Sequence, residues 1–595
     1  MKNIIKLSIL SISFCCLSSA FAQLSVPSGD VLYISSSTTV YSQENLVNNG
    51  TINGGGVLSL NGSTSTTVTG TGTIDKLSID KTSSTVTIST GVTSVTNNVT
   101  VNSGTLAAGG KLTLKSTSSG TAYVGTFGSG ATLTGDVNCE LYVQGKRAFR
   151  FLAHPFNAAI ALSQLTDDID ITGSGGSTNG FTSTGTNNPS SFWFDETIGD
   201  ATTSGNNAGW TAFTNTNGNG TNSWDAKKGL RVLVRGAIGE GLTTTSYTPS
   251  AVTVDFTGNI NQGSITESFS CNSNTKFVVA TNPYPAPVQM TSLSYTNMGN
   301  YFYVWDVSMG TRGAYSSKAF SSSYVLPAYA SFNTEVSALG GTGSIGFTEA
   351  AKVASTSPAS GHFLERDSNY KLEINVFDTD TYWDKLQFFF HDQALSSYEN
   401  WDAVKFTNPD INFYSFSTNN HTLSIDSRPF ENNKTIPLGF KSSLKKDFTL
   451  SFDQLQLPEG YKLFLKDYYT NKTTEIIYGT KYNFTVNADT LSQGDHRFEI
   501  QAVDIYASNK NLQKQSLYKV GPNPITGKEL NVYYPASNFT EIEITDLNGK
   551  ALVSTSLNSN KTAESINIES LKQGIYIVKI KSDNDLVFTQ KIIKL

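Results

Sequence analysis

Short runs of alternating apolar and polar residues, separated by Gly and Asn, dominate residues 24–135 of this 595-residue chain. Examples are "GTINGGGVLSL", "GTGTIDKLSID" and "STVTIST". A period of two places successive side chains on opposite faces of a β-strand, and Gly and Asn favour the turns between strands. The composition agrees, because 50 Gly accompany only four Met. The pattern therefore predicts an all-β fold.

A repeat inside this block suggests how its strands are arranged. The motif Gly-Thr-Ile or Gly-Thr-Leu begins at Gly50, Gly72 and Gly104, with spacings of 22 and 32 residues. A spacing near one solenoid coil predicts a short parallel β-solenoid over residues 23–136, with Val, Ile and Leu inside and Thr and Ser outside. An antiparallel sandwich with Gly-rich turns is the alternative.

The first 22 residues have the features of a secretory signal peptide. A basic start and a short apolar run end at Ala20-Phe21-Ala22, so cleavage is predicted before Gln23 and export to the periplasm follows. A core helix or a membrane anchor is the alternative, although the run is short for a membrane span. Cys15 and Cys16 do not form a lipidation site, because Ser13-Phe14 precede them in place of a small pair. No later run reaches the about 18 apolar residues of a span, so an integral membrane protein is not expected.

Charge and cysteine content limit the partners. Cleavage removes two lysines and changes the formal net charge from −6 to −8. No basic patch is present, so nucleic acid is not an expected partner. The mature chain keeps Cys139 and Cys271, which either pair in an oxidising compartment or lie apart as buried thiols.

Further β-rich regions follow the first block. Period-two runs such as "GLRVLVRG" and "TKFVVATNPYP" predict an antiparallel β-sandwich or jelly roll over residues 137–360. Runs such as "YKLEINVF" and "HRFEIQAV" predict a second sandwich over residues 361–505. Residues 506–517 are interpreted as a linker, and residues 518–595 as a last, immunoglobulin-like domain.

Four motifs in the last domain occur in a recognisable order. "VGPNPITGKELNVYYP" is followed by "IEITDLNGKALV", "INIESLKQGIYIVKI" and "TQKIIKL". Together they resemble the type A C-terminal sorting domain of the type IX secretion system of Bacteroidota. The resemblance implies recognition by that secretion machinery and delivery to the cell surface or the medium. The residues that match the sorting pattern are Pro522, Asn523, Pro524, Asp546, Gly549, Lys550, Gly574, Tyr576 and Lys591.

The middle of the chain also resembles other exported proteins that carry this tail. The similar segments include "LYVQGKRAFRFLAHPF", "NPYPAP" and "VLPAYASF". This resemblance implies architecture without an assigned activity. The sequence departs from the pattern at Val288-Gln289-Met290, where an acidic residue is often expected.

The sequence predicts no catalytic residues and no required cofactor. It contains no H-E-x-x-H, G-x-S-x-G or phosphate-binding loop. Its five histidines, which are His154, His362, His391, His421 and His496, stand singly without metal-ligand spacing. A pair of glycosidase carboxylates cannot be located in an acidic chain from sequence alone.

Two acidic runs are candidate calcium sites, because calcium prefers carboxylate and carbonyl oxygens. The first run offers Asp167, Asp168 and Asp170, and the second offers Asp378, Asp380 and Asp384. Neither run follows the EF-hand pattern, and solvated loops are the alternative.

Three tryptophans near Gly- and Asn-rich loops, Trp193, Trp210 and Trp224, are candidates for stacking on sugar rings. Core packing is the alternative for each ring. The favoured function is non-catalytic adhesion to a glycan or another surface, and a polysaccharide lyase or glycosidase is the alternative. A net charge of −8 favours a neutral glycan. The nearest basic cluster, Lys146-Arg147 with Arg150, is expected to be partly structural because it alternates with phenylalanines.

Overall fold

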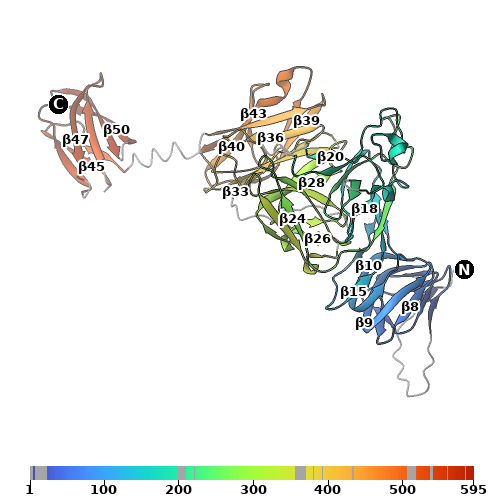
Figure 1. Cartoon of the computed structure of the whole chain (residues 1–595). Coiled ribbons are helices and arrows are strands. Elements are labelled where there is room, and N and C mark those ends of the chain that lie inside the picture. The colour runs from blue at the N-terminus through green and yellow to red at the C-terminus, as the bar shows by residue number, and fades with distance from the viewer. Residues whose placement is uncertain are drawn as a thin grey trace, which may run out of the picture. The chain divides into compact units, whose positions relative to one another are not determined.

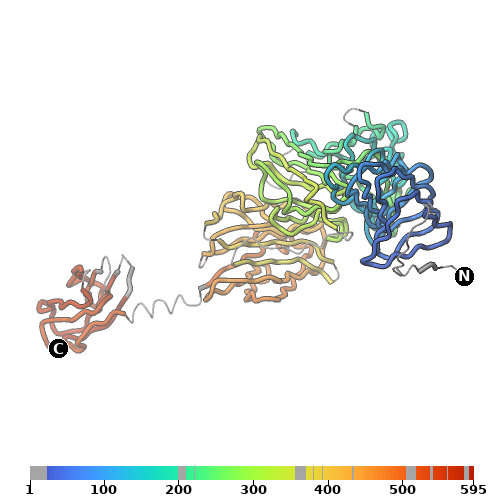
Figure 2. Tube along the Cα trace, turned by 90° about the horizontal axis from the view of Figure 1, so that it is seen from below, coloured from blue at the N-terminus to red at the C-terminus, as the bar shows by residue number. Residues whose placement is uncertain are grey.

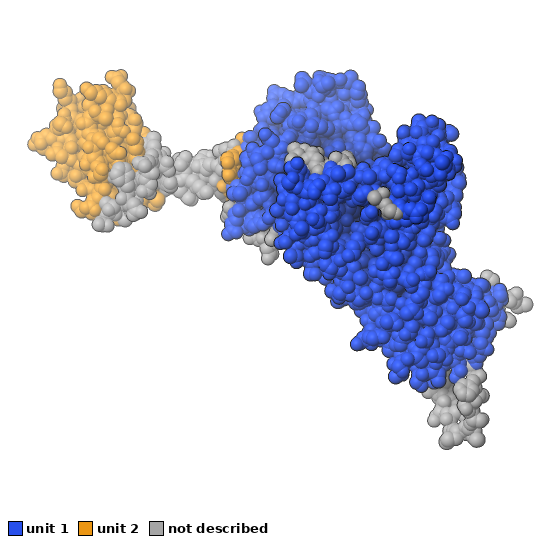
Figure 3. All heavy atoms as spheres, in the orientation of Figure 1, with its two compact units in different colours: residues 1–430, 435–456, 465–500 blue, residues 431–434, 457–464, 501–595 orange. Residues whose placement is uncertain are grey.

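The computed structural model describes residues 4–6, 23–198, 209–219, 222–354, 370–379, 381–391, 393–431, 434–504, 517–535, 540–558, 561–582 and 585–595. Ala20 and Ala22 of the predicted cleavage site and residues 506–516 of the predicted linker lie outside this description. The chain divides into two compact units (Figure 3). Unit 1 comprises residues 1–430, 435–456 and 465–500, and unit 2 comprises residues 431–434, 457–464 and 501–595.

The N-terminal block forms a parallel β-solenoid, drawn in blue in Figures 1 and 2. Its strands belong to one 15-stranded sheet. They are β1 (Ile4–Lys6), β2 (Leu24–Val26), β3 (Val31–Tyr33), β4 (Thr39–Ser42), β5 (Leu46–Asn48), β6 (Thr51–Asn53), β7 (Val57–Gly62), β8 (Thr66–Thr69), β9 (Thr73–Thr90), β10 (Thr93–Ala107), β11 (Leu112–Leu114), β14 (Tyr123–Val124), β15 (Thr132–Thr134), β16 (Val137–Val143) and β23 (Val252–Gly258). The pairings among β1 to β16 in this sheet are all parallel, which confirms the solenoid prediction over the sandwich alternative.

Aliphatic side chains stack inside the solenoid from coil to coil. One ladder runs through Ile52, Ile74, Val95 and Leu114, which pair in register across β6, β9, β10 and β11. Each of these side chains is at most 2% exposed. Because one coil has too little apolar surface to bury its own face, the stacking of neighbours supplies the core.

The glycine repeat marks equivalent places in two coils and a different place in a third. Thr51 pairs with Thr73, so Gly50 and Gly72 precede the same face of successive coils. A Cβ atom added to Gly72 would lie 2.4 Å from the carbonyl oxygen of Gly50, which explains the need for glycine there. Gly104 precedes a residue on another face, because Thr105 pairs with Thr85, and this accounts for the irregular spacing.

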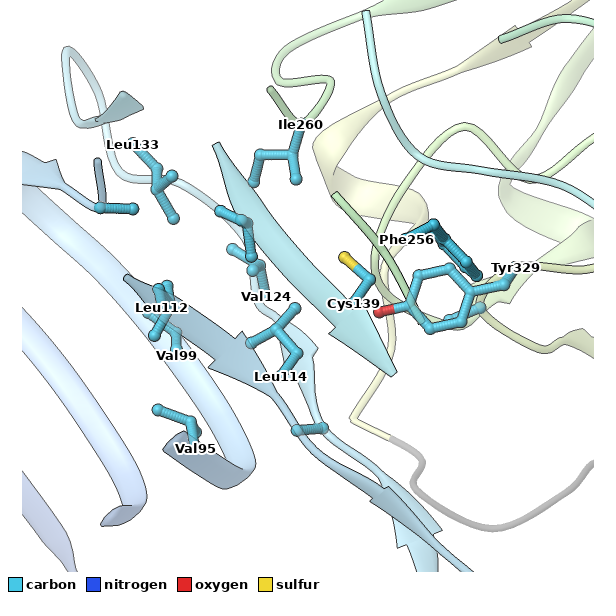
Figure 4. Packing of buried hydrophobic residues seen from close by; sticks show 14 of the residues in the cluster. Val95, Val99, Leu112, Leu114, Val124, Leu133, Cys139, Phe256, Ile260 and Tyr329 are labelled. Atoms are coloured by element: carbon cyan, nitrogen blue, oxygen red, sulfur yellow. The ribbon is translucent and has the colours of Figure 1, made fainter. Parts of the chain in front are cut away.

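The solenoid sheet continues past the domain boundary predicted at residue 136. Strand β16 pairs parallel with β11, and β23 then pairs antiparallel with β16. Cys139 lies next to Leu114 in the core ladder, and Figure 4 shows it beside Tyr329. Both cysteines are free and buried, so the disulfide alternative is wrong. Burial raises the pKa of the Cys139 thiol to about 12.

Antiparallel sheets make up the next region, as predicted. One sheet contains β17 (Ala148–Leu152), β22 (Leu230–Val234), β19 (Ser191–Phe194) and β20 (Trp210–Ala212). A second contains β24 (Ile265–Ser270), β32 (Thr342–Phe347) and β27 (Ser294–Thr296). A third contains β25 (Phe277–Thr281), β31 (Ser331–Val336), β28 (Met298–Asp306) and β29 (Ala314–Ala319).

An 11-stranded sheet follows. Its strands are β33 (Tyr370–Phe377), β34 (Tyr382–Phe390), β35 (Ala403–Val404), β36 (Ile411–Phe416), β37 (Thr422–Arg428), β38 (Thr435–Ser442), β39 (Asp447–Gln456), β40 (Tyr461–Asp467), β41 (Lys472–Ile476), β42 (Lys481–Thr485) and β43 (Gly494–Asp504). The pairings among β33 to β39 and β42 are antiparallel, except that β34 and β37 run parallel. Among the described residues, no helix is both long and apolar enough to cross a membrane.

The last domain is built from two small sheets. One contains β44 (Lys519–Gly521), β45 (Glu529–Tyr533) and β48 (Ala563–Asn567). The other contains β47 (Ala551–Leu557), β46 (Thr540–Thr545), β49 (Gly574–Ser582) and β50 (Asp585–Lys594). Alternating residues of both sheets, including Leu530, Ile542, Val578 and Ile592, form one buried cluster.

A buried carboxyl group makes the stability of unit 1 depend on pH. Glu267 on β24 is fully buried and accepts hydrogen bonds from the backbone N–H and the hydroxyl of Thr281. Burial raises the pKa of Glu267 from 4.5 to about 8, although the hydrogen bonds from Thr281 oppose the rise. The folded state therefore holds a proton that the unfolded state releases, so this contribution to stability is lost as pH rises from about 4.5 to about 8.

We expect Glu267→Gln to reduce this loss, because glutamine keeps the shape and does not titrate. The parent should lose up to about 1.4 kcal/mol per pH unit within this window from this residue. Thermal unfolding of the mature protein at a series of pH values measures the slope. Equal slopes in parent and variant would show that Glu267 is ionised in the folded protein.

Candidate functional site

The Pro-Asn-Pro motif lies against the last strand of the chain. The Asn523 side chain donates to the carbonyl of Lys591 at 2.9 Å and accepts from the backbone N–H of Ile593 at 2.9 Å. Ile525 donates its N–H to the carbonyl of Ile593, and Leu595 donates to the carbonyl of Ile525. The peptide bonds preceding Pro522 and Pro524 are both cis. We call this set of contacts the Asn523 clamp; it joins residues about 70 positions apart.

The second sorting motif is a tight hairpin between β46 and β47. The Asp546 carboxylate accepts from the N–H groups of Asn548 and Lys550, each at 2.9 Å. Gly549 has a φ of +84°, a conformation that glycine adopts without strain. This conformation closes the tight turn that joins β46 to β47.

The remaining matched residues lie on the two terminal strands. Gly574 begins β49 and pairs with Lys594, and Lys591 on β50 pairs with Ile577. The ring of Tyr576 is buried, and its hydroxyl donates to the carbonyl of Lys572 at 2.8 Å. The structure thus brings the first and last motifs together. The Asp546 hairpin follows Thr545, which pairs with Ile577, the partner of Lys591 in the same sheet. The part each residue plays in sorting stays a prediction.

Two of the three tryptophans predicted to stack on sugars are packed in the interior. Trp224 is fully buried, and Trp210 is 9% exposed and packs edge-on against Phe194. Trp193 is half-buried, and the ammonium of Lys228 lies 4.3 Å from its ring centre. Stacking of Trp210 and Trp224 on an external sugar is therefore wrong, because apolar burial outweighs exposure of such large rings.

The first acidic run holds loops in place. Asp168 accepts from the N–H of Asp255 at 2.8 Å, and Asp170 accepts from Thr182 at 2.8 Å and from the N–H of Gly239. Asp167 is exposed. In the parts of the chain that the structure describes, no three His, Cys, Asp or Glu side chains gather to hold a metal ion, so these aspartates are not brought together as ligands.

The second acidic run is also engaged by protein groups. Asp378 accepts from the N–H of Thr381 and from the indole of Trp383, both at 2.9 Å. Asp384 is buried in an ion pair with Lys405. Asp380 lies outside the described residues, so calcium binding by this run stays a prediction.

The basic cluster near residue 147 is largely structural, as expected. Lys146 donates to the carbonyls of Val307 and Gly310, and the buried Arg150 donates to the carbonyl of Gln144 at 3.0 Å. These contacts occupy Lys146 and Arg150 with backbone carbonyls of the protein itself.

An open groove of about 810 Å³ crosses the outer face of the solenoid. Strands β4, β7, β9, β10 and β14 form its floor, and each strand comes from a different coil. The lining residues are Thr39, Tyr41, Val57, Ser59, Lys76, Leu77, Ser78, Asp80, Asn97, Asn98, Thr100, Asn102, Tyr123 and Ala354. We call this site the solenoid groove.

The groove presents its polar groups in register. Tyr41 pairs with Ser59, Ser59 with Ser78, and Ser78 with Thr100, which makes one row across four strands. Adjacent strands lie about 4.8 Å apart, so hydroxyl groups recur at that spacing along the row. The Tyr41 ring at one end of this row is 67% exposed, whereas Ser59 and Ser78 in the middle are 1% and 5% exposed. Tyr123 is buried and lines the groove outside the row, because it pairs with Asn98.

A carboxylate organises the middle of the groove. Asp80 accepts from Ser59 at 2.6 Å, from Ser78 at 2.7 Å and from the amide of Asn102 at 2.6 Å. Partial burial acts to raise the pKa of Asp80, but the three hydrogen bonds together lower it. Lys76 donates to the carbonyl of Gly55 at 2.8 Å. The groove therefore holds fixed polar groups and one charge of each sign.

The solenoid groove could not be predicted from the sequence. Its residues are spaced one coil apart, and nothing in the alternation tells which outer face is hollow. One feature of the sequence could have indicated the groove: Tyr, Asn and Asp residues stand at outward positions of the coils where Thr and Ser are usual.

Comparison with known proteins identifies the tail. Residues 519–595 match the family described as a secretion system C-terminal sorting domain. The chain is therefore an exported protein of the type IX secretion class, directed to the cell surface or the extracellular space. No curated protein matches the chain.

Two solved structures show weak likeness. A polysaccharide lyase aligns over 38% of this chain and 39% of its own length, at 7% identity and a TM-score of 0.11. The chain thus spans about two fifths of the lyase. The BSP domain of a biofilm associated protein aligns over 76% of this chain and 95% of its own length, at 8% identity and a TM-score of 0.12. At these TM-scores neither likeness supports a conclusion about fold or function.

Proposed function

We propose that this exported protein is a non-catalytic surface protein that binds a neutral glycan in the solenoid groove. The observation that carries the proposal is the exposed ring of Tyr41, which ends a row of polar side chains in register that is fixed by Asp80. A sugar offers an apolar C–H face to this ring, and its hydroxyl groups can bond the accessible side chains of Thr100 and Asn102 in the lining.

Preorganisation supports binding at this site. Asp80 holds Ser59, Ser78 and Asn102 in place before any ligand arrives, so little side-chain entropy is lost on binding. The single carboxylate and single ammonium of the lining balance each other, which favours an uncharged ligand over an acidic polymer.

The composition of the groove disfavours catalysis. Hydrolysis of a glycosidic bond ordinarily uses two carboxyl groups on opposite sides of the bond. Among the described residues that line the groove, Asp80 is the one carboxylate, and its hydrogen bonds lower its pKa instead of raising it to suit a general acid. We therefore expect neither reducing ends nor unsaturated products from polysaccharides that bind.

Replacing Tyr41 with alanine should weaken glycan binding about 2- to 10-fold, because a stacked aromatic contributes about 0.5–1.5 kcal/mol. Affinity electrophoresis of the mature protein in gels containing xylan, mannan or β-glucan measures the effect. Tyr33→Ala is a matched control, since Tyr33 is 46% exposed on β3 and does not line the groove.

Binding should also change little between low and high salt, because screening acts on charged contacts. Loss of affinity in high salt, or equal binding by the Tyr41→Ala and Tyr33→Ala proteins, would contradict the proposal. Formation of unsaturated sugars would favour the lyase alternative.

A further inference from the structure

A second hollow, separate from the solenoid groove, lies on the 11-stranded sheet. It has a volume of about 940 Å³ and is formed by β39, β42 and the end of β33. The lining residues are Phe377, Asp378, Thr379, Asp447, Phe448, Thr449, Ser451, Asp453, Lys481, Asn483, Phe484 and Thr485. We call it the sheet hollow; β33 and β39 are labelled in Figure 1.

The floor of the sheet hollow is a ladder of paired polar side chains. Asp447 faces Thr485 in the β39–β42 register, and Thr449 faces Asn483. The hydroxyl of Thr485 donates to Asp447 at 2.6 Å, and the hydroxyl of Thr449 donates to the side-chain oxygen of Asn483 at 2.8 Å. These side chains are fixed by one another and still expose oxygen and nitrogen atoms to a ligand, because Asp447 and Asn483 lie at the surface.

The deeper end of the ladder is anchored in the sheet. Asp453 accepts from the amide of Asn375 at 2.7 Å and from the hydroxyl of Ser451 at 2.5 Å. Asn375 is 7% exposed, so this end cannot shift without disturbing β33. The ring of Phe377 is half-buried at the same wall and offers an apolar surface.

The charges of the sheet hollow differ from those of the solenoid groove. Three carboxylates and one ammonium line it. Asp378 is paired with Lys446, which does not line the hollow. Asp447 and Asp453 accept hydrogen bonds from neutral groups. The lining therefore favours a ligand with hydroxyl groups and a positive charge.

We propose that the sheet hollow binds an amino-sugar polymer whose amines are protonated. The ring hydroxyls of the sugar would form hydrogen bonds with the paired side chains of Thr449 and Asn483. An ammonium group of the sugar would form an ion pair with Asp447, and the Phe377 ring would contact the apolar face of a sugar ring. Charge-assisted hydrogen bonds of this kind are stronger than neutral ones. The site is a second binding surface, independent of the neutral glycan proposed for the solenoid groove.

The test uses the mature chain and a matched pair of probes in mildly acidic buffer. One probe is an oligomer of β-1,4-linked glucosamine, and the other is its fully N-acetylated counterpart of equal length. Calorimetric titration should show binding of the glucosamine oligomer, weakened in high salt, and binding of the acetylated oligomer at least about 10-fold weaker, the equivalent of one charge-assisted hydrogen bond.

Two variants should change the affinity for glucosamine oligomers in opposite directions. Asp447→Asn keeps an acceptor for Thr485 and removes the charge, so affinity should fall about 3- to 10-fold. Lys481→Gln removes the repelling ammonium, so affinity should rise about 2- to 3-fold. Asp167→Asn makes the same charge change at an exposed aspartate outside the hollow and should have no effect.

Tyr41→Ala should leave glucosamine binding unchanged, which separates this site from the solenoid groove. The proposal is overturned if the glucosamine oligomer does not bind, or if both probes bind equally. It is also overturned if Lys481→Gln weakens binding, or if Asp447→Asn and Asp167→Asn behave alike.

Discussion

Deletion of residues 518–595 should leave the protein in the periplasm. The predicted signal peptide would carry the chain across the inner membrane, and the matched sorting domain at residues 519–595 directs the next step. That domain has its own buried core, so its removal should not unfold the rest of the chain. The expected result is close to complete loss of surface and medium protein, measured by cell fractionation and immunoblotting.

A shorter deletion tests whether the folded tail, and not merely its presence, is needed. Removing residues 591–595 deletes the fully buried Ile592 and both partners of Asn523 in the Asn523 clamp. We expect it to block export as well. Normal export of another type IX substrate in the same cells is the control, and surface delivery of either truncated protein would contradict the assignment.

Alternation and repeat length were sufficient to predict the solenoid. The period of 22 between Gly50 and Gly72 corresponds to one coil, because Thr51 and Thr73 are paired. Strand length was not predictable in the same way. Strands β9 and β10 run for 18 and 15 residues, since the parallel ladder continues around corners through register shifts. The boundary expected at residue 136 lies in this continuous sheet, because β16 extends the ladder from β11.

The candidate sites could not be predicted from local sequence in the same way as the solenoid. Local sequence marks Trp210 and Trp224 as aromatic residues near glycine-rich loops, but burial depends on partners far along the chain, such as Phe151 and His154. For Tyr41, alternation correctly predicts a position on an outer face, and the ring is exposed. Alternation does not predict the groove that this ring lines. The tail was predictable in more detail because its turn and strand signals are local.

Replacing Asp467 with asparagine should destabilise the 11-stranded sheet by about 3–5 kcal/mol, the cost of leaving a buried charge unpaired. The side chains of Asp467 and Arg497 are 0% and 1% exposed. Asp467 accepts from Arg497 at 3.0 and 3.3 Å, from the hydroxyl of Tyr482 at 2.9 Å and from the N–H of Tyr469 at 2.9 Å. Asparagine would present an N–H₂ group to these donors and remove the only carboxylate paired with Arg497 among the described residues.

Hydrogen exchange of the mature protein measures this effect locally, since amides of β42 and β43 exchange through opening of the sheet. Lys441→Met is the matched control, because Lys441 forms an ion pair with Asp495 in which the two side chains are 57% and 38% exposed. Exposed pairs contribute at most about 1 kcal/mol, so Lys441→Met should change exchange little. The exchange rates of these amides could rise no more in Asp467→Asn than in Lys441→Met. That result would mean that water or another group compensates the charge of Arg497, and that the buried pair does not stabilise these strands.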